Sequence, residues 1–243
     1  VRGVRAMLTG EGLLRPLAEG PATGDKALLP LEAEVRSLFR RLERQRVAET
    51  GAAEGWSAQR LRSVLQSQYA DDEIIVVSNR QPYSHERRGG EIVVAQPASG
   101  LVTALEPVLR AASGTWIAHG SGSADVEVSD RDGCVRVPPD EPAYTLRRLW
   151  LTAEQVKGYY EGFANEGLWP LCHIAHVRPV FRAEDWRHFV DVSQRFADAV
   201  VKSAKRADPL VLVQDYHMPL VPQMIRDRLP QATVVTFWHI PWP

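Results

Sequence analysis

Four short apolar segments of this sequence are each followed closely by an ionisable residue. These residues are Arg80, His119, Asp215 and His239. An arginine presents a planar cationic fork that suits phosphate or carboxylate. A carboxylate accepts hydrogen bonds from sugar hydroxyls, and an imidazole can donate one to a developing negative charge. Ligands of an open α/β sheet bind beyond the carboxyl ends of its strands, so we expect these side chains to converge at one edge of the sheet.

Three of these residues also have a purely structural interpretation, which the sequence leaves open. Arg80 could form a surface salt bridge, and Asp215 could cap the helix that follows it. His239 could simply pack against Trp238 and Trp242. Only the positions of the side chains in the fold can decide between the two sets of interpretations.

A pair of small residues, Ser99 and Gly100, precedes a predicted helix. The free N–H groups and the dipole at a helix start can hold an anion. A plain N-cap is the alternative.

His173 and His176 are spaced like a metal-binding pair, but no further ligand set accompanies them, so we interpret them as structural or surface residues. The sequence contains no nucleophile elbow, Walker loop or dinucleotide-binding fingerprint.

The elements that must position these residues follow a strand–helix alternation. Short runs rich in β-branched residues predict strands at 73–78, 115–118, 210–213 and 232–238. Helical patterns lie near 101–109, where Pro107 should distort the helix, and near 152–163, 186–201 and 218–229. Residues 91–96 and 134–150 are expected to be antiparallel or peripheral. The pattern indicates an α/β domain with a mainly parallel sheet, whose strands present their carboxyl ends at one edge.

The first part of the chain has a different character. Residues 1–30 show no periodic pattern, and two amphipathic helices are expected in the remainder of residues 1–70. We therefore predict two parts: a partly irregular, partly helical N-terminal extension over 1–70 and an α/β domain over 71–243.

The composition excludes several classes of protein. The 243 residues include 29 basic and 30 acidic side chains, for a formal charge of −1. Binding to nucleic acid or an anionic membrane would favour a basic excess. No apolar run approaches the roughly 18 residues of a membrane span. The two cysteines, Cys134 and Cys172, do not make a disulfide scaffold, so we expect a cytoplasmic protein.

Six motifs occur in the order found in one enzyme family. They are IVVSNR at 75–80, SGLVTAL at 99–105, YYEGFAN at 159–165, LWP at 168–170, QDYH at 214–217 and HIPWP at 239–243. With these motifs, residues 73–243 resemble the N-terminal half of the trehalose-6-phosphate synthase family. These are retaining glycosyltransferases with two Rossmann-like domains, and residues 1–70 would be an extension.

The resemblance implies glucosyl transfer from a nucleotide-glucose to glucose 6-phosphate, forming α,α-trehalose 6-phosphate in trehalose biosynthesis. It implies no metal or other cofactor, with the nucleotide-glucose as co-substrate. The expected partners are these small molecules and a C-terminal Rossmann-like domain of the same protein, with a homo-oligomer as a further option. Because this chain would hold most of an acceptor site and one wall of a donor site, we expect the isolated domain to be inactive.

The resemblance also implies roles for individual residues. Acceptor contacts are implied for Arg80, Tyr160, Trp169 and Asp215, and donor contacts for Ser99, Gly100 and His239. Arg80 and Tyr160 would hold the acceptor phosphate, while Asp215 would bind the acceptor sugar. His239 would lie over the donor sugar and stabilise the transition state, which makes His239 and Asp215 the expected catalytic residues.

Two positions depart from the family pattern. Ser99 stands where the family usually has a glycine, and His119 stands where the bacterial enzyme has a tryptophan. His119 keeps another phosphorylated acceptor open, such as glycerol 3-phosphate or a cyclitol phosphate. A non-catalytic subunit that binds sugar phosphates is the alternative outside catalysis. A nicotinamide-binding domain would need a glycine fingerprint that the sequence lacks.

Overall fold

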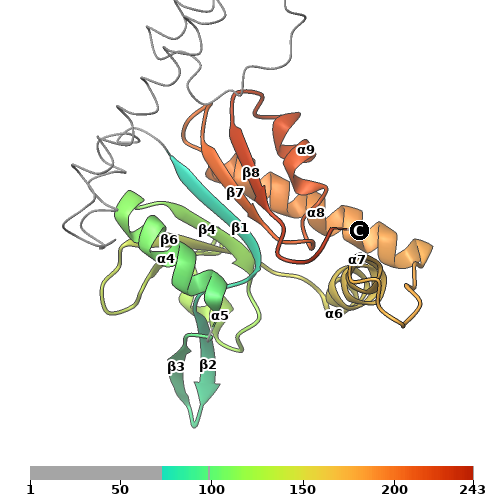
Figure 1. Ribbon diagram of the computed structural model, residues 1–243. Helices are drawn as coiled ribbons and strands as arrows, with labels where there is room; N and C mark the ends of the chain where they lie inside the picture. Colours follow the sequence, from blue (N-terminus) through green and yellow to red (C-terminus); the bar gives the residue numbers. More distant parts are fainter. Residues whose placement is uncertain (1–72, 98, 243) are drawn as a thin grey trace, which may run out of the picture. The chain divides into compact units, whose positions relative to one another are not determined.

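The computed structural model describes residues 73–97 and 99–242 (Figure 1). The helices expected within residues 1–70 lie outside the described residues. Between residues 73 and 242, strands and helices alternate along the chain, which confirms the predicted α/β class with a mainly parallel sheet. None of the helices in this part of the chain combines the length and the apolar character needed to cross a membrane.

Six strands form one sheet in the order β5-β6-β4-β1-β7-β8. Their bounds are β1 (Ile74–Arg80), β4 (Thr115–His119), β5 (Cys134–Val137), β6 (Tyr144–Leu149), β7 (Leu210–Gln214) and β8 (Thr233–Phe237). Neighbouring strands in this sheet are parallel except for β5 with β6. The strands predicted from the apolar runs, β1, β4, β7 and β8, are therefore confirmed.

A second, two-stranded sheet is a hairpin that projects away from the main sheet (Figure 1). It pairs β2 (Ser84–Arg88) antiparallel with β3 (Glu91–Ala95), as expected for this region. The expectation for residues 134–150 is right for β5, which is an antiparallel edge strand. It is only partly right for β6, whose pairing is antiparallel with β5 alone. β6 lies inside the sheet and pairs parallel with β4. Its arginines, Arg147 and Arg148, are buried, and their charge concealed the strand's interior position.

The helices cover both faces of the sheet. They are α4 (Gly100–Ala112), α5 (Asp125–Val128), α6 (Ala153–Val156), the π-helix η2 (Lys157–Leu168), α7 (Trp169–Cys172), α8 (Ala183–Ser203) and α9 (Val221–Arg226). Alternate residues of β1 explain the two layers. Ile74 and Val76 belong to the apolar cluster that contains Leu109 of α4. Ile75 and Val77 belong to the cluster that contains α8. A strand buried on both faces reads as a continuous apolar run, which is the pattern seen here.

The helix expected from Thr152 onward begins as predicted but continues differently. Thr152 forms a complete capping box with Gln155 at the start of α6. From Lys157 to Leu168 the chain then follows a π-helix, which is rare at this length. Its glycines lie close to neighbouring side chains: a Cβ added at Gly162 would lie 2.5 Å from Cγ of Asp185 on α8. This packing depends on α8, so local periodicity could not predict it.

Two other helices differ from the expectation in detail. α4 runs from Gly100 to Ala112 as one helix that includes Pro107. α9 covers Val221–Arg226, which is shorter than the predicted 218–229. The residues before α9 form turns instead, in which the Met218 amide donates to the Asp215 carbonyl.

Candidate functional site

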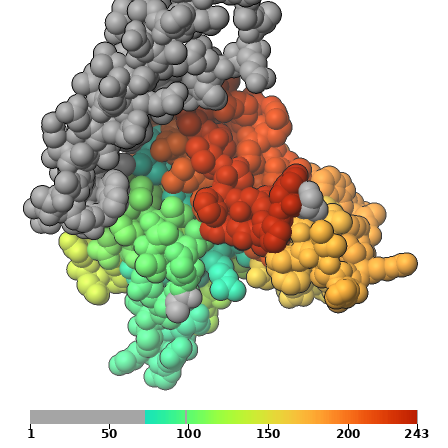
Figure 2. Space-filling model, viewed as in Figure 1, coloured from blue at the N-terminus to red at the C-terminus, as the bar shows by residue number. Residues whose placement is uncertain are grey.

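The carboxyl ends of β1, β7 and β8 and the start of α4 meet at one cavity, as predicted for Arg80, Asp215 and His239. His119, at the end of β4, was expected with them but does not line this cavity. This cavity, here called the Asp215 cavity, has a volume of about 320 Å³. Among the residues that line it are Arg80, Ser99, Tyr160, Asp215 and His239. In Figure 2 the red C-terminal segment lies between the green α4 and the yellow-orange segment around α6 and α7, which brings distant parts of the sequence together.

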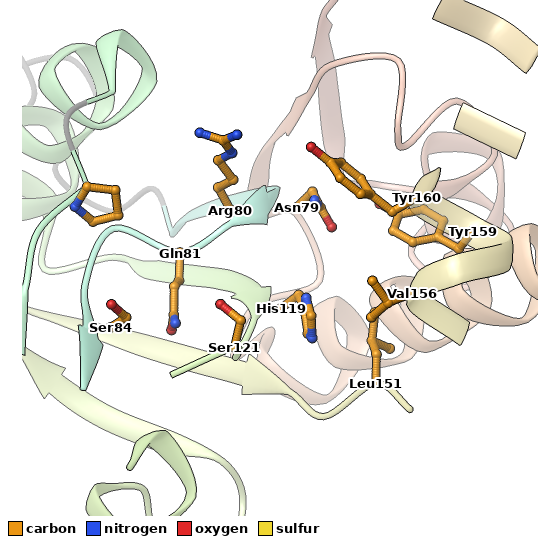
Figure 3. A pocket seen from close by; sticks show the side chains of 11 residues that line it. Asn79, Arg80, Gln81, Ser84, His119, Ser121, Leu151, Val156, Tyr159 and Tyr160 are labelled. Atoms are coloured by element: carbon orange, nitrogen blue, oxygen red, sulfur yellow. The ribbon is translucent and has the colours of Figure 1, made fainter. Parts of the chain in front are cut away.

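Arg80 and Tyr160 also belong to the lining of a second cavity. This one, here called the His119 cavity, has a volume of about 360 Å³ (Figure 3). Gln81, His119 and Ser121 are among its lining residues. Burial lowers the pKa of His119 below its ordinary value, so the neutral imidazole is favoured at this site. Arg80 and Tyr160 therefore stand where a ligand could extend from one cavity into the other.

Arg80 is held by its backbone and leaves its guanidinium available. The Arg80 carbonyl accepts a hydrogen bond of 2.7 Å from Oγ of Ser78, which itself accepts one of 2.8 Å from Nε1 of Trp116. Within the described residues the guanidinium has no ion-pair or hydrogen-bond partner, so the structure does not support the salt-bridge interpretation. In Figure 3 the hydroxyl of Tyr160 points toward the side of the cavity where Arg80 lies.

Asp215 adopts a left-handed backbone conformation, with φ of 75°. This region is costly for a residue other than glycine, and such strain often accompanies a functional site. Its Oδ1 accepts hydrogen bonds from the amides of Tyr216, at 2.8 Å, and of His239, at 3.3 Å. The N-cap of α9 is Leu220, so Asp215 does not cap that helix. The turn instead presents the carboxylate at the Asp215 cavity.

His239 is fixed by contacts from both neighbouring strands. Its Nε2 lies 3.1 Å from Oε1 of Gln214 at the end of β7. An amide oxygen only accepts, so Nε2 donates in this pair. The ring packs against Phe237, with the ring centroids 4.4 Å apart. The expected alternative of packing against the tryptophans is not seen, because Trp238 and Trp242 contact each other.

The predicted donor residues lie at the start of α4. Ser99 is the N-cap, has an extended backbone, and makes no side-chain cap hydrogen bond. It lines the Asp215 cavity. Gly100 is the first residue of the helix, and nothing lies within 4 Å of a Cβ added there. The positive end of the α4 dipole therefore faces open space beside the Asp215 cavity.

Trp169 does not share a cavity with the other predicted site residues. It begins α7, its residue surface is 43% exposed, and it lines neither cavity. Its indole stacks on His173, with ring centroids 3.9 Å apart. Its assignment to the acceptor pocket stays a prediction from the motif alone.

Asn79 and His217 are among the residues of the Asp215 cavity that were not assigned a role from the sequence. Oδ1 of Asn79 and Nε2 of His217 are buried without a hydrogen-bond partner in the described part of the chain. The ring of His217 packs against Tyr160 and Tyr216. Burial, together with the nearby Arg80 and His239, lowers its pKa to about 4, although Asp215 opposes this shift. Both residues belong to motifs quoted from the sequence, but only their neighbours had an obvious chemistry.

Gln81, which lines the His119 cavity, is hydrogen-bonded to a buried charged network. Nη2 of Arg148 lies 3.0 Å from Oδ1 of Asp125, and both side chains are 0% exposed. Burial alone would raise the pKa of Asp125. Hydrogen bonds from Gln81 and from the amides of His85 and Gly122, with the charge of Arg148, lower it below its ordinary value instead. The carboxylate is therefore ionised inside the protein.

The described residues between 73 and 242 contain no cluster of three or more His, Cys, Asp or Glu side chains arranged to hold a metal ion. His173 and His176 thus have no additional ligand around them in this part of the chain, in line with their structural interpretation. Whether the chemistry needs a metal stays a prediction.

Comparison with known proteins gives consistent matches over the same region. The family model described as Glycosyltransferase family 20 matches residues 72–243. A trehalose-6-phosphate synthase of Mycobacterium ulcerans (strain Agy99) is 42% identical over 177 residues, which cover 72% of this chain and 34% of the relative. One from Mycobacterium avium (strain 104) is 40% identical over 176 residues, with coverages of 72% and 35%.

Solved structures match over a similar share of the chain. A structure described as trehalose-6-phosphate from E. coli bound with UDP-2-fluoro glucose has a TM-score of 0.54 and 26% identity, covering 71% of this chain and 34% of that one. An alpha,alpha-trehalose-phosphate synthase (UDP-forming) from Burkholderia vietnamiensis has a TM-score of 0.54 and 25% identity, with the same coverages. The chain thus spans about a third of the length of the relatives that it matches.

Proposed function

Because the chain belongs to glycosyltransferase family 20, and within it to the trehalose-6-phosphate synthases, we propose that it forms the acceptor side of a retaining glucosyltransferase. The whole protein would transfer glucose from a nucleotide-glucose to glucose 6-phosphate and release α,α-trehalose 6-phosphate. The observation that carries this proposal is the arrangement of one cavity. A cation, a phenol, a carboxylate and an imidazole line it together, contributed by Arg80, Tyr160, Asp215 and His239.

The acceptor would be bound through its two chemical ends. The guanidinium of Arg80 and the hydroxyl of Tyr160 suit a phosphate, because both donate hydrogen bonds and one is cationic. The carboxylate of Asp215 suits sugar hydroxyls, which donate to it. Two hydrogen bonds from backbone amides hold this carboxylate in place. The acceptor hydroxyl would thereby be oriented toward the donor before reaction, which lowers the entropic part of the barrier.

Transfer with retention needs the new bond on the face that the leaving group vacates. The bond from the sugar C1 to the diphosphate oxygen breaks, and a bond from C1 to the acceptor oxygen forms on that same face. The acceptor proton passes to the leaving diphosphate. The start of α4, beside Ser99 and Gly100, offers free amides and a positive dipole end to the diphosphate. His239 would stabilise charge developing at the donor sugar.

The relatives suggest which nucleotide the donor carries. The E. coli protein was solved with UDP-2-fluoro glucose, and the Burkholderia enzyme is described as UDP-forming. We therefore propose UDP-glucose as the donor for the protein that contains this chain. We also propose a cytoplasmic enzyme without a metal cofactor, whose donor site is completed by a second Rossmann-like domain of the same protein.

Replacement of Arg80 tests the assignment of the acceptor phosphate site. In the full-length protein, Arg80→Ala should raise the KM for glucose 6-phosphate by at least tenfold, because a hydrogen bond to a charged group contributes about 1.5–3 kcal/mol. The KM for UDP-glucose should change little. Initial rates of trehalose 6-phosphate formation at varied acceptor concentration would measure this.

Arg88→Ala is the matched control, since Arg88 is exposed on the β2–β3 hairpin and lines neither cavity. Unchanged acceptor kinetics in Arg80→Ala would refute the assignment of Arg80.

One observation favours a second candidate acceptor. His119 lines the same cavity as Arg80 and Tyr160. A neutral imidazole at this position can form a hydrogen bond with an acceptor molecule, which an apolar side chain could not do. Another phosphorylated acceptor, such as glycerol 3-phosphate, could use it. Initial rates of the full-length protein with a panel of phosphorylated acceptors decide between the two: a higher kcat/KM for a compound other than glucose 6-phosphate would select the alternative.

A further inference from the structure

The chain leaves the main sheet directly at the proposed phosphate ligand. β1 ends at Arg80, and the pairing of β1 with β4 shifts in register between Val77 and Arg80. Such an irregularity redirects side chains at the end of a strand. The regular ladder therefore does not by itself fix where the Arg80 side chain points, and other contacts must do so.

The next residue, Gln81, is buried and is held by two opposite charges. Its Nε2 donates to Oδ2 of Asp125 at 2.6 Å, and its Oε1 accepts from Nε of Arg148 at 2.8 Å. Both polar ends of the amide are thus satisfied by groups that are themselves buried and paired with each other. A side chain held at both ends in this way has a single orientation, and it fixes the backbone on which it sits.

The same carboxylate and guanidinium also hold the backbone next to Ser84 and Ser121, two lining residues of the His119 cavity. Asp125 accepts from the amides of His85, at 2.8 Å, and Gly122, at 2.7 Å. Arg148 donates to the Tyr83 carbonyl at 3.2 Å. The network therefore ties β6, α5, the loop after β4 and the segment after Arg80 to one another. Gln81, which is held by this network, lines the His119 cavity together with Arg80 and Ser121 (Figure 3).

Building on the proposed function, we propose that Gln81 is a positioning residue for the acceptor phosphate. Held between Asp125 and Arg148, it directs Arg80 toward the phosphate, without touching the substrate's reacting atoms itself. A buried ion pair gives little net stability compared with apolar packing but can specify a unique arrangement. Here the ion pair of Arg148 and Asp125 would specify the direction of the Arg80 guanidinium, and Arg80 lines both cavities.

The test is a double-mutant cycle in the full-length protein. Gln81→Met keeps the side-chain size but removes both hydrogen bonds, and it leaves the ion pair of Arg148 and Asp125 in place. We expect the KM for glucose 6-phosphate to rise about fivefold to twentyfold, with the KM for UDP-glucose within about twofold of the wild type. In the Arg80→Ala background the same substitution should have almost no effect, because there is no guanidinium left to direct.

The matched control is Gln223→Met, which removes a similar glutamine-to-aspartate hydrogen bond at an exposed position, from Gln223 of α9 to Asp227 at the end of that helix. It should leave both KM values unchanged. Thermal unfolding of each variant reports loss of structure separately. The inference is overturned if Gln81→Met leaves the acceptor KM unchanged, raises both KM values equally, or has the same effect with and without Arg80.

Calorimetry with glucose 6-phosphate repeats the cycle without turnover. A wild-type protein that binds glucose 6-phosphate but transfers no glucose would refute the proposed reaction, while the binding cycle would still decide the role of Gln81. A wild-type protein that does not bind glucose 6-phosphate would overturn both.

Discussion

At the scale of single residues, the site derives its chemistry from where the strands end. Asp215 has an ordinary side chain, but its left-handed backbone and two amide hydrogen bonds direct the carboxylate to the cavity. His217 is neutral because it is enclosed: its side chain is 12% exposed, and its pKa falls to about 4. A neutral imidazole beside Asp215 leaves the negative charge of that carboxylate available for a ligand.

The lowered pKa of His217 predicts a dependence of stability on pH. The unfolded chain binds a proton at this residue below about pH 6.5, whereas the folded chain does not until about pH 4. Stability is therefore lost as the pH falls from 6.5 to 4, by up to roughly 3 kcal/mol from this group. In the full-length protein, His217→Gln should lose less stability over this interval than the wild type. Urea unfolding at pH 7 and at pH 4.5 would measure the difference.

His176→Gln provides the control for this measurement, because His176 is exposed and lines neither cavity. Its pH dependence should equal that of the wild type. If His217→Gln also follows the wild type, His217 is protonated in the folded protein near its ordinary pKa.

The sequence indicated some of these residues and could not indicate others. Arg80, Asp215 and His239 were visible because each follows an apolar strand, and parallel strands end at one edge. The burial of His217 was not visible, because it depends on Tyr160, which lies more than fifty residues earlier in the chain. Trp169 shows the opposite case: a motif assigned it to the acceptor pocket, while the structure places it outside both cavities.

At the scale of elements, two ion pairs of the same chemical type lie in opposite environments. Arg148 and Asp125 are fully buried between β6 and α5. Arg87 of β2 and Glu127 of α5 are paired at the surface, where both side chains are about half exposed. Since water screens the second pair but not the first, the two should respond very differently to substitution.

We therefore predict that Arg148→Met lowers the free energy of unfolding by about 3–5 kcal/mol, because it leaves the charge of Asp125 buried without its partner. Arg87→Met, the exposed counterpart, should cost about 1 kcal/mol or less. Chemical denaturation of both variants of the full-length protein would compare them. Equal losses would mean that Asp125 is solvated or protonated when Arg148 is replaced.

The elements differ in how far the sequence determined them. β1 and β7 were predicted because β-branched runs in the interior of a parallel sheet have a clear signature. β8 carries the same kind of run, although it lies at the edge of the sheet and is mostly exposed among the described residues. The interior position of β6 was not expected because two of its buried side chains are arginines. The burial of Arg148 depends on Asp125 of α5 and on Gln81, which follows β1. The π-helix η2 follows the capping box of Thr152 and Gln155, but its wide turns form where Gly162 meets Asp185 of α8. Local periodicity therefore could not predict the interior position of β6 or the π-helical geometry of η2.

At the scale of the whole molecule, the described residues supply fewer positive charges to the site than the two proposed substrates carry negative charges. Arg80 is the one lysine or arginine that lines either cavity among residues 73–97 and 99–242. The proposed reaction brings together a diphosphate and a monophosphate, and each phosphate group adds negative charge. One guanidinium and one helix dipole cannot balance both substrates at close range. Further cations must then come from outside this lining, and the relatives are about three times as long as the segment matched here.

This imbalance predicts a separation of binding from transfer. The 243-residue chain alone, once circular dichroism has shown that it is folded, should bind glucose 6-phosphate in calorimetry but form no trehalose 6-phosphate from UDP-glucose. The full-length protein should do both. Arg80→Ala in the isolated chain should abolish the binding, since that residue would supply the cationic contact to the phosphate. Turnover by the isolated chain at a rate near that of the full-length protein would show that these residues already contain the donor site, and that the charge argument is wrong.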